Sequence, residues 1–96
     1  MNTKKVIKAM KALSNKNRFE IFMAIFNSNK QTSFEKEECF IYDTIEKLNI
    51  GTPTISHHLK ELSNADLIIT ERRGKNIVAR INEDTIKELG ELLNLD

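Results

Sequence analysis

The segment spanning residues 50–62 constrains the fold of this chain more than any other part of the sequence. It reads Ile-Gly-Thr-Pro-Thr-Ile-Ser-His-His-Leu-Lys-Glu-Leu and predicts a helix. We expect Thr52 to cap this helix and Pro53 to take the first helical position, where a missing N–H costs nothing. At about 100° of rotation per residue, its apolar side chains fall on one narrow face; they are Ile55, Leu59 and Leu62. The helix therefore requires a protein core on one side and presents polar groups on the other.

Another helix is predicted directly before this one in the sequence, over residues 37–48. Its inner stripe consists of Phe40, Ile41, Thr44, Ile45 and Leu48. The turn Asn49–Gly51 follows, and Asn or Gly near a helix end suits the left-handed conformation that terminates helices. Two helices joined by about three residues that include a Gly form a helix-turn-helix arrangement.

A β-hairpin with a basic tip is predicted within residues 67–81. Its turn, residues 73–76, contains the Gly that a tight hairpin requires. Basic side chains flank the tip at Arg72, Arg73 and Lys75, and they are suited to a phosphate backbone or a narrow minor groove. The alternative is an exposed hairpin whose charges protect it against aggregation. A helix-turn-helix followed by a basic hairpin is the outline of a winged helix-turn-helix.

The remaining segments complete a mainly α fold with one small β-hairpin. A first helix capped by Thr3 is expected to end near Leu13, and Ser14 or Asn15 then caps a second helix over residues 16–27. The broad apolar face of that second helix comprises Phe19, Phe22, Met23 and Phe26, widened by Ile21 and Ile25. Residues 27–36 are polar and predict a loop, and a last helix begins at Asn82 or Glu83. The predicted order is four helices, two strands and a fifth helix, in a single winged helix-turn-helix domain over residues 1–96.

The outward face of the helix after the turn has the chemistry of a DNA-reading surface. His57 lies almost opposite the apolar centre, whereas His58 lies at the boundary and is expected to be partly buried. Hydroxyl, imidazole and ammonium groups on such a face can bond base edges or phosphates, although an ordinary solvated face has the same composition. The predicted DNA-binding residues are Thr52, Thr54, Ser56, His57, Lys60, Arg72, Arg73 and Lys75.

With these residues in place, the sequence resembles the ArsR/SmtB family of winged-helix repressors. Residues 12–21, Ala-Leu-Ser-Asn-Lys-Asn-Arg-Phe-Glu-Ile, are similar to the family's opening motif ALxxxxRxxIL. Residues 54–62, Thr-Ile-Ser-His-His-Leu-Lys-Glu-Leu, are similar to its recognition helix TVSHHLKxL, and residues 65–75 are similar to AGLVxxxReGr and the wing. The resemblance covers nearly the whole chain and implies a homodimer that binds an operator and represses transcription until a signal releases it.

The sequence departs from the family where metal-sensing members bind their ion. Those members carry a Cys-x-Cys pair just before the Asp of the third helix; aligned on Asp43, the paired positions here are Phe40 and Tyr42. The only cysteine, Cys39, lies one residue away, and one thiol cannot supply the three or four ligands of a soft-metal site. The last helix contains no His for the family's other metal site. We therefore predict neither a metal nor another cofactor, and interpret Cys39 as a small buried apolar residue, with an intersubunit pair as the alternative.

A two-fold dimer is predicted from the apolar stripes of the first and last helices, which remain after the helix-turn-helix core is built. The predicted interface residues are Val6, Ile7, Met10, Ile86, Leu89 and Leu93. Such a dimer places two reading helices about one DNA turn apart and predicts a palindromic operator. The alternative is that these stripes complete the core of the monomer.

Charge and composition exclude some functions and leave two rivals. The net charge is only +1, but residues 1–18 carry six basic groups and no acid, and local field rather than total charge steers a polyanion. We predict no enzyme, because neither an acid/base pair nor a glycine-rich phosphate loop is present. No membrane-spanning run and no signal-peptide pattern are found, so a cytoplasmic location is expected. The rivals are a winged helix that binds protein as an adaptor and an architectural binder without operator preference.

Overall fold

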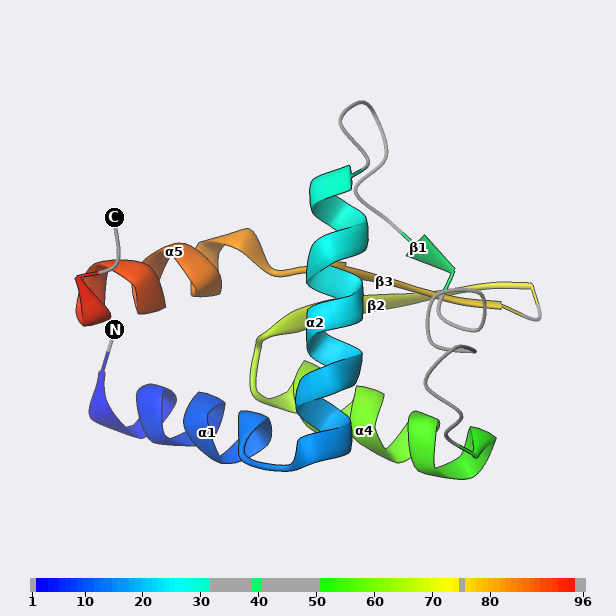
Figure 1. The fold of residues 1–96 in the computed structure, drawn as a ribbon, viewed down its shortest axis with the longest axis horizontal. Helices are drawn as coiled ribbons and strands as arrows, with labels where there is room; N and C mark the ends of the chain where they lie inside the picture. The colour runs from blue at the N-terminus through cyan, green and yellow to red at the C-terminus, as the bar shows by residue number, and fades with distance from the viewer. Residues whose placement is uncertain (1, 32–38, 41–50, 75, 95–96) are drawn as a thin grey trace.

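The computed structural model describes residues 2–31, 39–40, 51–74 and 76–94. Within these ranges the chain forms four helices and a small three-stranded antiparallel sheet (Figure 1). The elements are α1 (Thr3–Leu13), α2 (Lys16–Gln31), β1 (Cys39–Phe40), α4 (Thr52–Asn64), β2 (Ile68–Arg73), β3 (Asn76–Ile81) and α5 (Glu83–Leu93).

The first two helices are capped by asparagine side chains. Asn2 Oδ1 accepts a hydrogen bond from the backbone N–H of Lys5 at 2.8 Å, so the cap of α1 is Asn2 and not Thr3, which is the first helical residue. Asn15 Oδ1 accepts from the N–H of Arg18 at 3.0 Å and caps α2, as the sequence predicted. Both asparagines satisfy N–H groups that have no partner within the first turn of a helix.

α2 is longer than predicted, and its buried face is rotated. Residues 27–31 continue the helix although they were predicted as a loop, while residues 32–36 of that loop lie outside the described residues. The buried side chains are Ile21, Phe22 and Ile25, and Phe19 is 45% exposed. The prediction centred the face on four large side chains at helical spacing. The branched isoleucines, treated there as the margin, lie at the centre instead.

The predicted helix over residues 37–48 is wrong at the two positions that the structure describes. Cys39 and Phe40 form the strand β1, which pairs antiparallel with β3 through Cys39–Ala79 and Phe40–Val78. Pairing with β3 overrides the weak helical periodicity of this segment, as tertiary contacts often override local propensity. The rest of the predicted helix, with the turn residues Asn49 and Ile50, lies outside the described residues.

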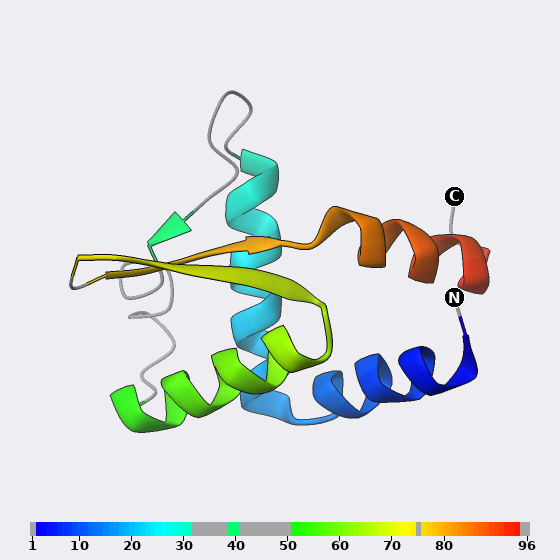
Figure 2. The same ribbon diagram turned by 180° about the vertical axis from the view of Figure 1, so that it is seen from behind.

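The hairpin is confirmed at the predicted position. β2 pairs with β3 along its whole length, from Ile68–Ile81 to Arg73–Asn76, and the sheet order is β1-β3-β2. Gly74 adopts φ +61° in the two-residue connection, a conformation that only glycine enters without steric cost. Figure 2 shows the hairpin as a narrow ribbon that runs alongside α4 and points away from α1 and α5.

A single core joins four helices, α1, α2, α4 and α5, to the inner face of the hairpin. α2 stands across the sheet, and α4 packs against both α2 and β2. The buried apolar residues of this core are Ala9, Ala12, Ile21, Phe22, Ile25, Ile55, Leu59, Leu62, Ala65, Leu67, Ile68, Ala79, Ile81 and Leu89. This core fixes the outer face of α4 relative to the hairpin.

The end of α4 is closed by a Schellman motif, which aims the chain into β2. The N–H of Leu67 donates to the carbonyl of Leu62, and the N–H of Asp66 donates to the carbonyl of Ser63, both at 3.0 Å. Asp66 lies between them with φ +61°. Leu62 and Leu67 are both fully buried, the apolar contact that usually accompanies this motif.

We expect Asp66→Val to lower the free energy of unfolding by about 1–2 kcal/mol, because a β-branched residue is strained in the left-handed conformation that an aspartate tolerates. Asp66 is exposed, so the substitution removes no core contact. Urea unfolding of the two proteins measures the difference. Asp66→Gly is the matched control and should equal or exceed the natural chain in stability. Equal stabilities of the Val and Gly variants would contradict this account of the turn.

Candidate nucleic-acid interface

α4 begins one residue earlier than the sequence predicted. Thr52 is already helical, the preceding cap position is Gly51, and no side chain caps this N-terminus. Pro53 thus follows Thr52 inside the first turn, where its missing N–H still costs no hydrogen bond. The helix ends at Asn64.

The inner face of α4 is confirmed. Ile55, Leu59 and Leu62 are each no more than 4% exposed, whereas Thr54, Ser56, His57 and Lys60 are exposed. His58 is only 5% exposed and is therefore buried more completely than the partial burial expected for it. Thr54, Ser56, His57 and Lys60 thus form an outward polar face. Of the two neighbouring imidazoles, that of His57 lies in solvent and that of His58 in the interior.

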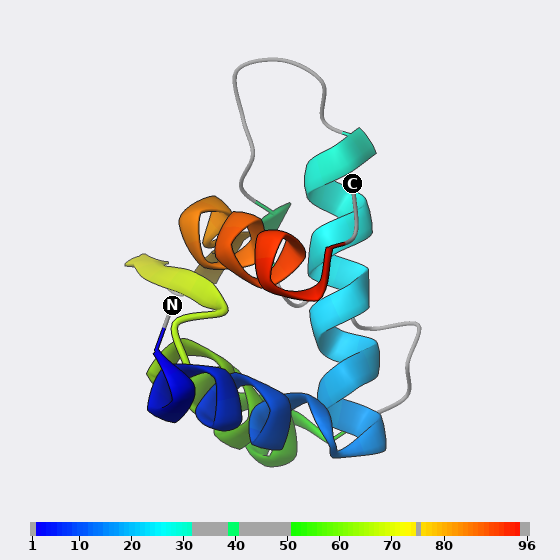
Figure 3. The same ribbon diagram turned by 90° about the vertical axis from the view of Figure 1, so that its left-hand side faces the viewer.

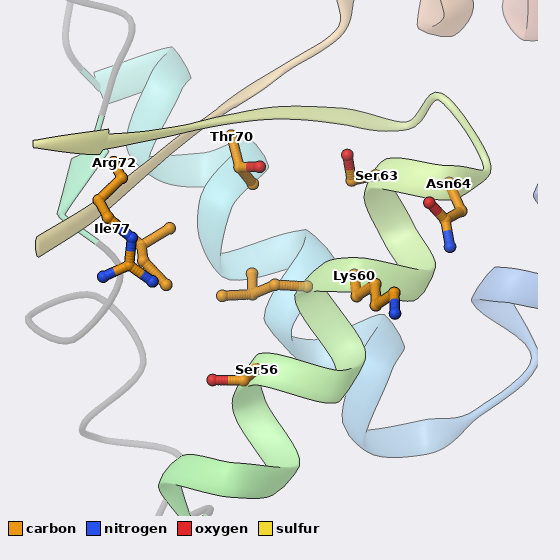
Figure 4. A pocket seen from close by; sticks show the side chains of 8 residues that line it. Ser56, Lys60, Ser63, Asn64, Thr70, Arg72 and Ile77 are labelled. Carbon is orange, nitrogen blue, oxygen red and sulfur yellow. The ribbon is translucent and has the colours of Figure 1, made fainter.

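A groove of about 280 Å³ separates the outer side of α4 from the hairpin (Figure 4). Ser56 and Lys60 approach it from successive turns of α4, and Arg72 approaches it from β2. Its floor and walls comprise Ser56, Leu59, Lys60, Ser63, Asn64, Thr70, Arg72 and Ile77. Two cationic side chains and several hydroxyl and amide groups therefore line one concave surface between α4 and the hairpin.

Strand parity places the two neighbouring arginines on opposite faces of the hairpin. Arg72 and Thr70 both line the groove, because residues two apart on a strand share a face. Arg73 shares the other face with Glu71, and its Nε donates to Glu71 Oε2 at 2.7 Å. The charge of Arg73 is thus partly compensated within β2, while the guanidinium of Arg72 lies beside the outer face of α4.

The structure brings together some of the predicted DNA-binding residues and separates others. Ser56, Lys60 and Arg72 share the groove, and Thr54 and His57 are exposed on the neighbouring outward side of α4. The side chains of Thr52 and Lys75 are outside what the structure describes. Ser63, Asn64 and Thr70 also line the groove and were not predicted. The signal for Ser63 was its position seven residues after Ser56, which returns to the same helix face.

Behind this face, Arg18 connects three helices. Its Nε donates to His58 Nδ1 at 3.4 Å, and its Nη1 donates to the carbonyl of Ala12, the second-last residue of α1, at 3.3 Å. Burial lowers the pKa of His58 below 6.5, and the adjacent Arg18 and then His57 lower that pKa further. An Nδ1 that accepts from Arg18 carries no proton, so this geometry corresponds to the neutral imidazole protonated on Nε2.

The opposite end of the molecule carries an exposed apolar surface. α1 and α5 project to the same side, where both chain ends lie (Figures 1 and 3). Four large apolar side chains on these two helices are 40–51% exposed: Ile7, Met10, Leu92 and Leu93. Lys5 of α1 and Glu88 of α5 form an exposed ion pair at 3.9 Å. Of the predicted dimer residues, Leu89 is instead buried in the protomer's own core, and Val6 and Ile86 are half-buried.

The described residues contain no group of three or more His, Cys, Asp or Glu side chains able to hold a metal ion. Within the same parts of the chain, no helix is both long and apolar enough to span a bilayer.

Comparison with known proteins agrees with this geometry. Residues 32–70 match the family model described as bacterial regulatory protein, arsR family. The matched residues include α4 and the start of β2. No curated protein sequence matches the chain.

Solved structures match over almost the whole chain. The homodimeric winged helix-turn-helix DNA-binding domain of a possible ArsR-family regulator from Mycobacterium bovis is 21% identical, with a TM-score of 0.69, and the match covers 96% of this chain and 77% of that one. The transcriptional regulator HlyU from Vibrio vulnificus is 22% identical, with a TM-score of 0.66 and coverage of 97% and 88%. An ArsR-like regulator from Rhodococcus is 17% identical, with a TM-score of 0.60 and coverage of 95% and 84%. The winged helix-turn-helix fold and the resemblance to the ArsR family are therefore confirmed.

Proposed function

We propose that this winged helix-turn-helix protein, similar to the ArsR family of regulators, is a sequence-specific DNA-binding repressor that acts as a homodimer. The observation that carries the proposal is that Lys60 of α4 and Arg72 of β2 line the same groove beside the exposed polar face of α4. Positive charge on two protruding elements, one a helix and one a ribbon, suits a DNA duplex whose major groove holds the helix.

Different side chains contact the bases and the phosphates. His57 and Thr54 project where base edges would lie, and each can form a hydrogen bond with them. Lys60, Arg72 and the hydroxyl of Ser56 line one groove and are placed for contacts with DNA phosphates. Base contacts then specify the site, and phosphate contacts supply affinity and register.

The exposed apolar surface on α1 and α5 supports a two-fold dimer through these helices. Ile7, Met10 and Leu93 were predicted at such an interface, and Leu92 belongs to the same surface. The Mycobacterium bovis domain, which shares the fold, is homodimeric. Two copies of α4 would then read the two halves of a palindromic operator about one DNA turn apart, and occupancy of a promoter would block transcription.

Selection of bound fragments from the genome of the source organism tests the proposal. Purified protein is mixed with sheared genomic DNA, and the recovered fragments are compared in gel shifts at low and at high salt. We expect a palindromic motif whose binding survives salt better than that of random DNA. Equal binding of all sequences would indicate an architectural binder, and the absence of binding at low salt would favour the protein-binding adaptor.

His57→Ala should reduce sequence discrimination by about 1 kcal/mol, because a single imidazole makes one hydrogen bond to a base edge rather than a bidentate pair. The measurement compares the dissociation constants of the selected motif and of a scrambled duplex. Glu61→Ala is the control, since Glu61 lies on the same helix and its carboxylate is unsuited to phosphate. An unchanged ratio in His57→Ala would remove His57 from the base-reading set.

A further inference from the structure

Arg18 lies at the junction of three helices that have different functions. It belongs to α2, and its guanidinium donates to the end of α1 and to the buried side of α4. α1 carries part of the exposed apolar surface, and α4 carries the polar face beside the groove. A planar guanidinium presents its donors in a fixed fork, so the two bonds together set the angle between the helices that they join.

We propose that Arg18 and His58 are positioning residues: the pair holds α4 at the angle required for operator binding, and does so only while His58 is neutral. This inference rests on the proposed DNA-binding function and adds a pH-sensitive element to it. His58 is the only buried partner through which Arg18 reaches α4 among the hydrogen bonds of the described residues. Both residues lie behind the reading face and contact no duplex themselves.

Protonation of His58 would place two donors face to face. In the imidazolium both ring nitrogens carry hydrogen, so Nδ1–H would point at the Nε–H of Arg18 from 3.4 Å. Two positive charges would then adjoin each other in a buried site. The described groups that act on His58 are Arg18 from α2 and His57 from α4, and both disfavour a charge there. When the His58 imidazole binds a second proton, its hydrogen bond with Arg18 therefore breaks. Either α4 moves away from Arg18, or α4 shifts from its position in the core.

The pH dependence has a definite sign. Because the pKa of His58 is lowered in the folded chain, the neutral form is favoured by folding, and that stability is complete above the ordinary value of 6.5. It is lost as the pH falls from 6.5 through the pKa of the folded chain. Operator affinity should decline over the same acid range, opposite to the increase expected when an exposed imidazole near phosphates becomes charged.

The test therefore uses the His57→Gln protein as the reference, so that His58 is the only histidine in the sequence. The probe is the genomic duplex most enriched in the selection described above, labelled with a fluorophore. We expect the affinity of the reference to fall about fivefold between pH 7.5 and 5.0. The fall should be about twofold or less after His58→Gln, because glutamine keeps a neutral acceptor for Arg18 at every pH. An equal fall in DNA affinity with and without His58→Gln would overturn the proposal.

A second variant tests Arg18 directly. Arg18→Met keeps a long unbranched side chain without donors, and should weaken binding about tenfold at pH 7.5 while the circular dichroism and the oligomeric state stay unchanged. If Arg18→Met fails to fold, Arg18→Lys is used in its place. It should also weaken DNA binding, because the lysine ammonium lacks the forked donors of a guanidinium. If the Arg18 variants bind the duplex as tightly as the protein with Arg18 intact, Arg18 has no positioning role.

Amide NMR spectra separate this proposal from the proposed function. In the reference protein, the signals of Ala12, Arg18 and the buried side of α4 should shift together between pH 7.5 and 5.0, and should not after His58→Gln. This readout needs no DNA. Absence of DNA binding with a shared shift would defeat the proposed function alone, and independent shifts would defeat the positioning pair alone.

Discussion

Ile7→Glu should convert the protein to a monomer and weaken its binding to a palindromic operator by about 10²–10⁴-fold. Ile7 is 49% exposed on α1, so the charge costs little within one protomer. Across a two-fold axis the same residue meets its own counterpart or a near neighbour, and a carboxylate buried there has no partner. The large effect on affinity arises because the second half-site loses its tether to the first. Sedimentation and gel shifts with whole and half operators measure both consequences.

The matched control for this change is Phe19→Glu. Phe19 is 45% exposed, comparable with Ile7, but it lies on α2 and outside the surface of α1 and α5. It should leave the sedimentation coefficient unchanged. Leu93→Glu, which alters the surface from α5, should repeat the result of Ile7→Glu. Dimers that persist in both variants would place the interface elsewhere on the molecule.

The sequence predicted the elements that depend on local signals. A single proline, a glycine at a turn and a regular apolar stripe sufficed to define α4 and its inner face. The hairpin followed from Gly74 between two β-prone segments. In each case the chemistry that determines the element lies within a few residues of it, and the predicted position of Gly74 at the tip needed no knowledge of the rest of the fold.

The predictions are wrong where contacts between distant parts of the chain determine the local structure. Cys39 and Phe40 form a strand because β3 offers them an edge, a partner some 40 residues away that no local period reveals. Phe19 was predicted to be inside from its spacing, but Ile21 and Ile25 face the core because the sheet lies on their side of α2. The hydrogen bond between Arg18 and His58 spans 40 residues and was likewise invisible, although both residues belonged to recognised motifs.

Arg72→Ala should weaken binding to every DNA sequence by about tenfold to a hundredfold at low salt, because a guanidinium bonded to phosphate contributes a charge-assisted hydrogen bond. The slope of log affinity against log salt should become shallower by about 1, the signature of one lost phosphate contact. Discrimination between the operator and a scrambled duplex should stay nearly constant, since Arg72 lies beside the base-reading residues of α4 and not among them.

Arg73→Ala is the control that strand parity provides. Arg73 is the next residue along β2, equally basic, but it lies on the opposite face with its Nε bonded to Glu71 at 2.7 Å. Its loss should change affinity and salt slope much less than the loss of Arg72. From composition alone the two arginines are equivalent, and the sequence predicted the same role for both. Equal effects of the two substitutions would therefore mean that the duplex contacts the tip of the hairpin from both faces, rather than through the groove beside α4.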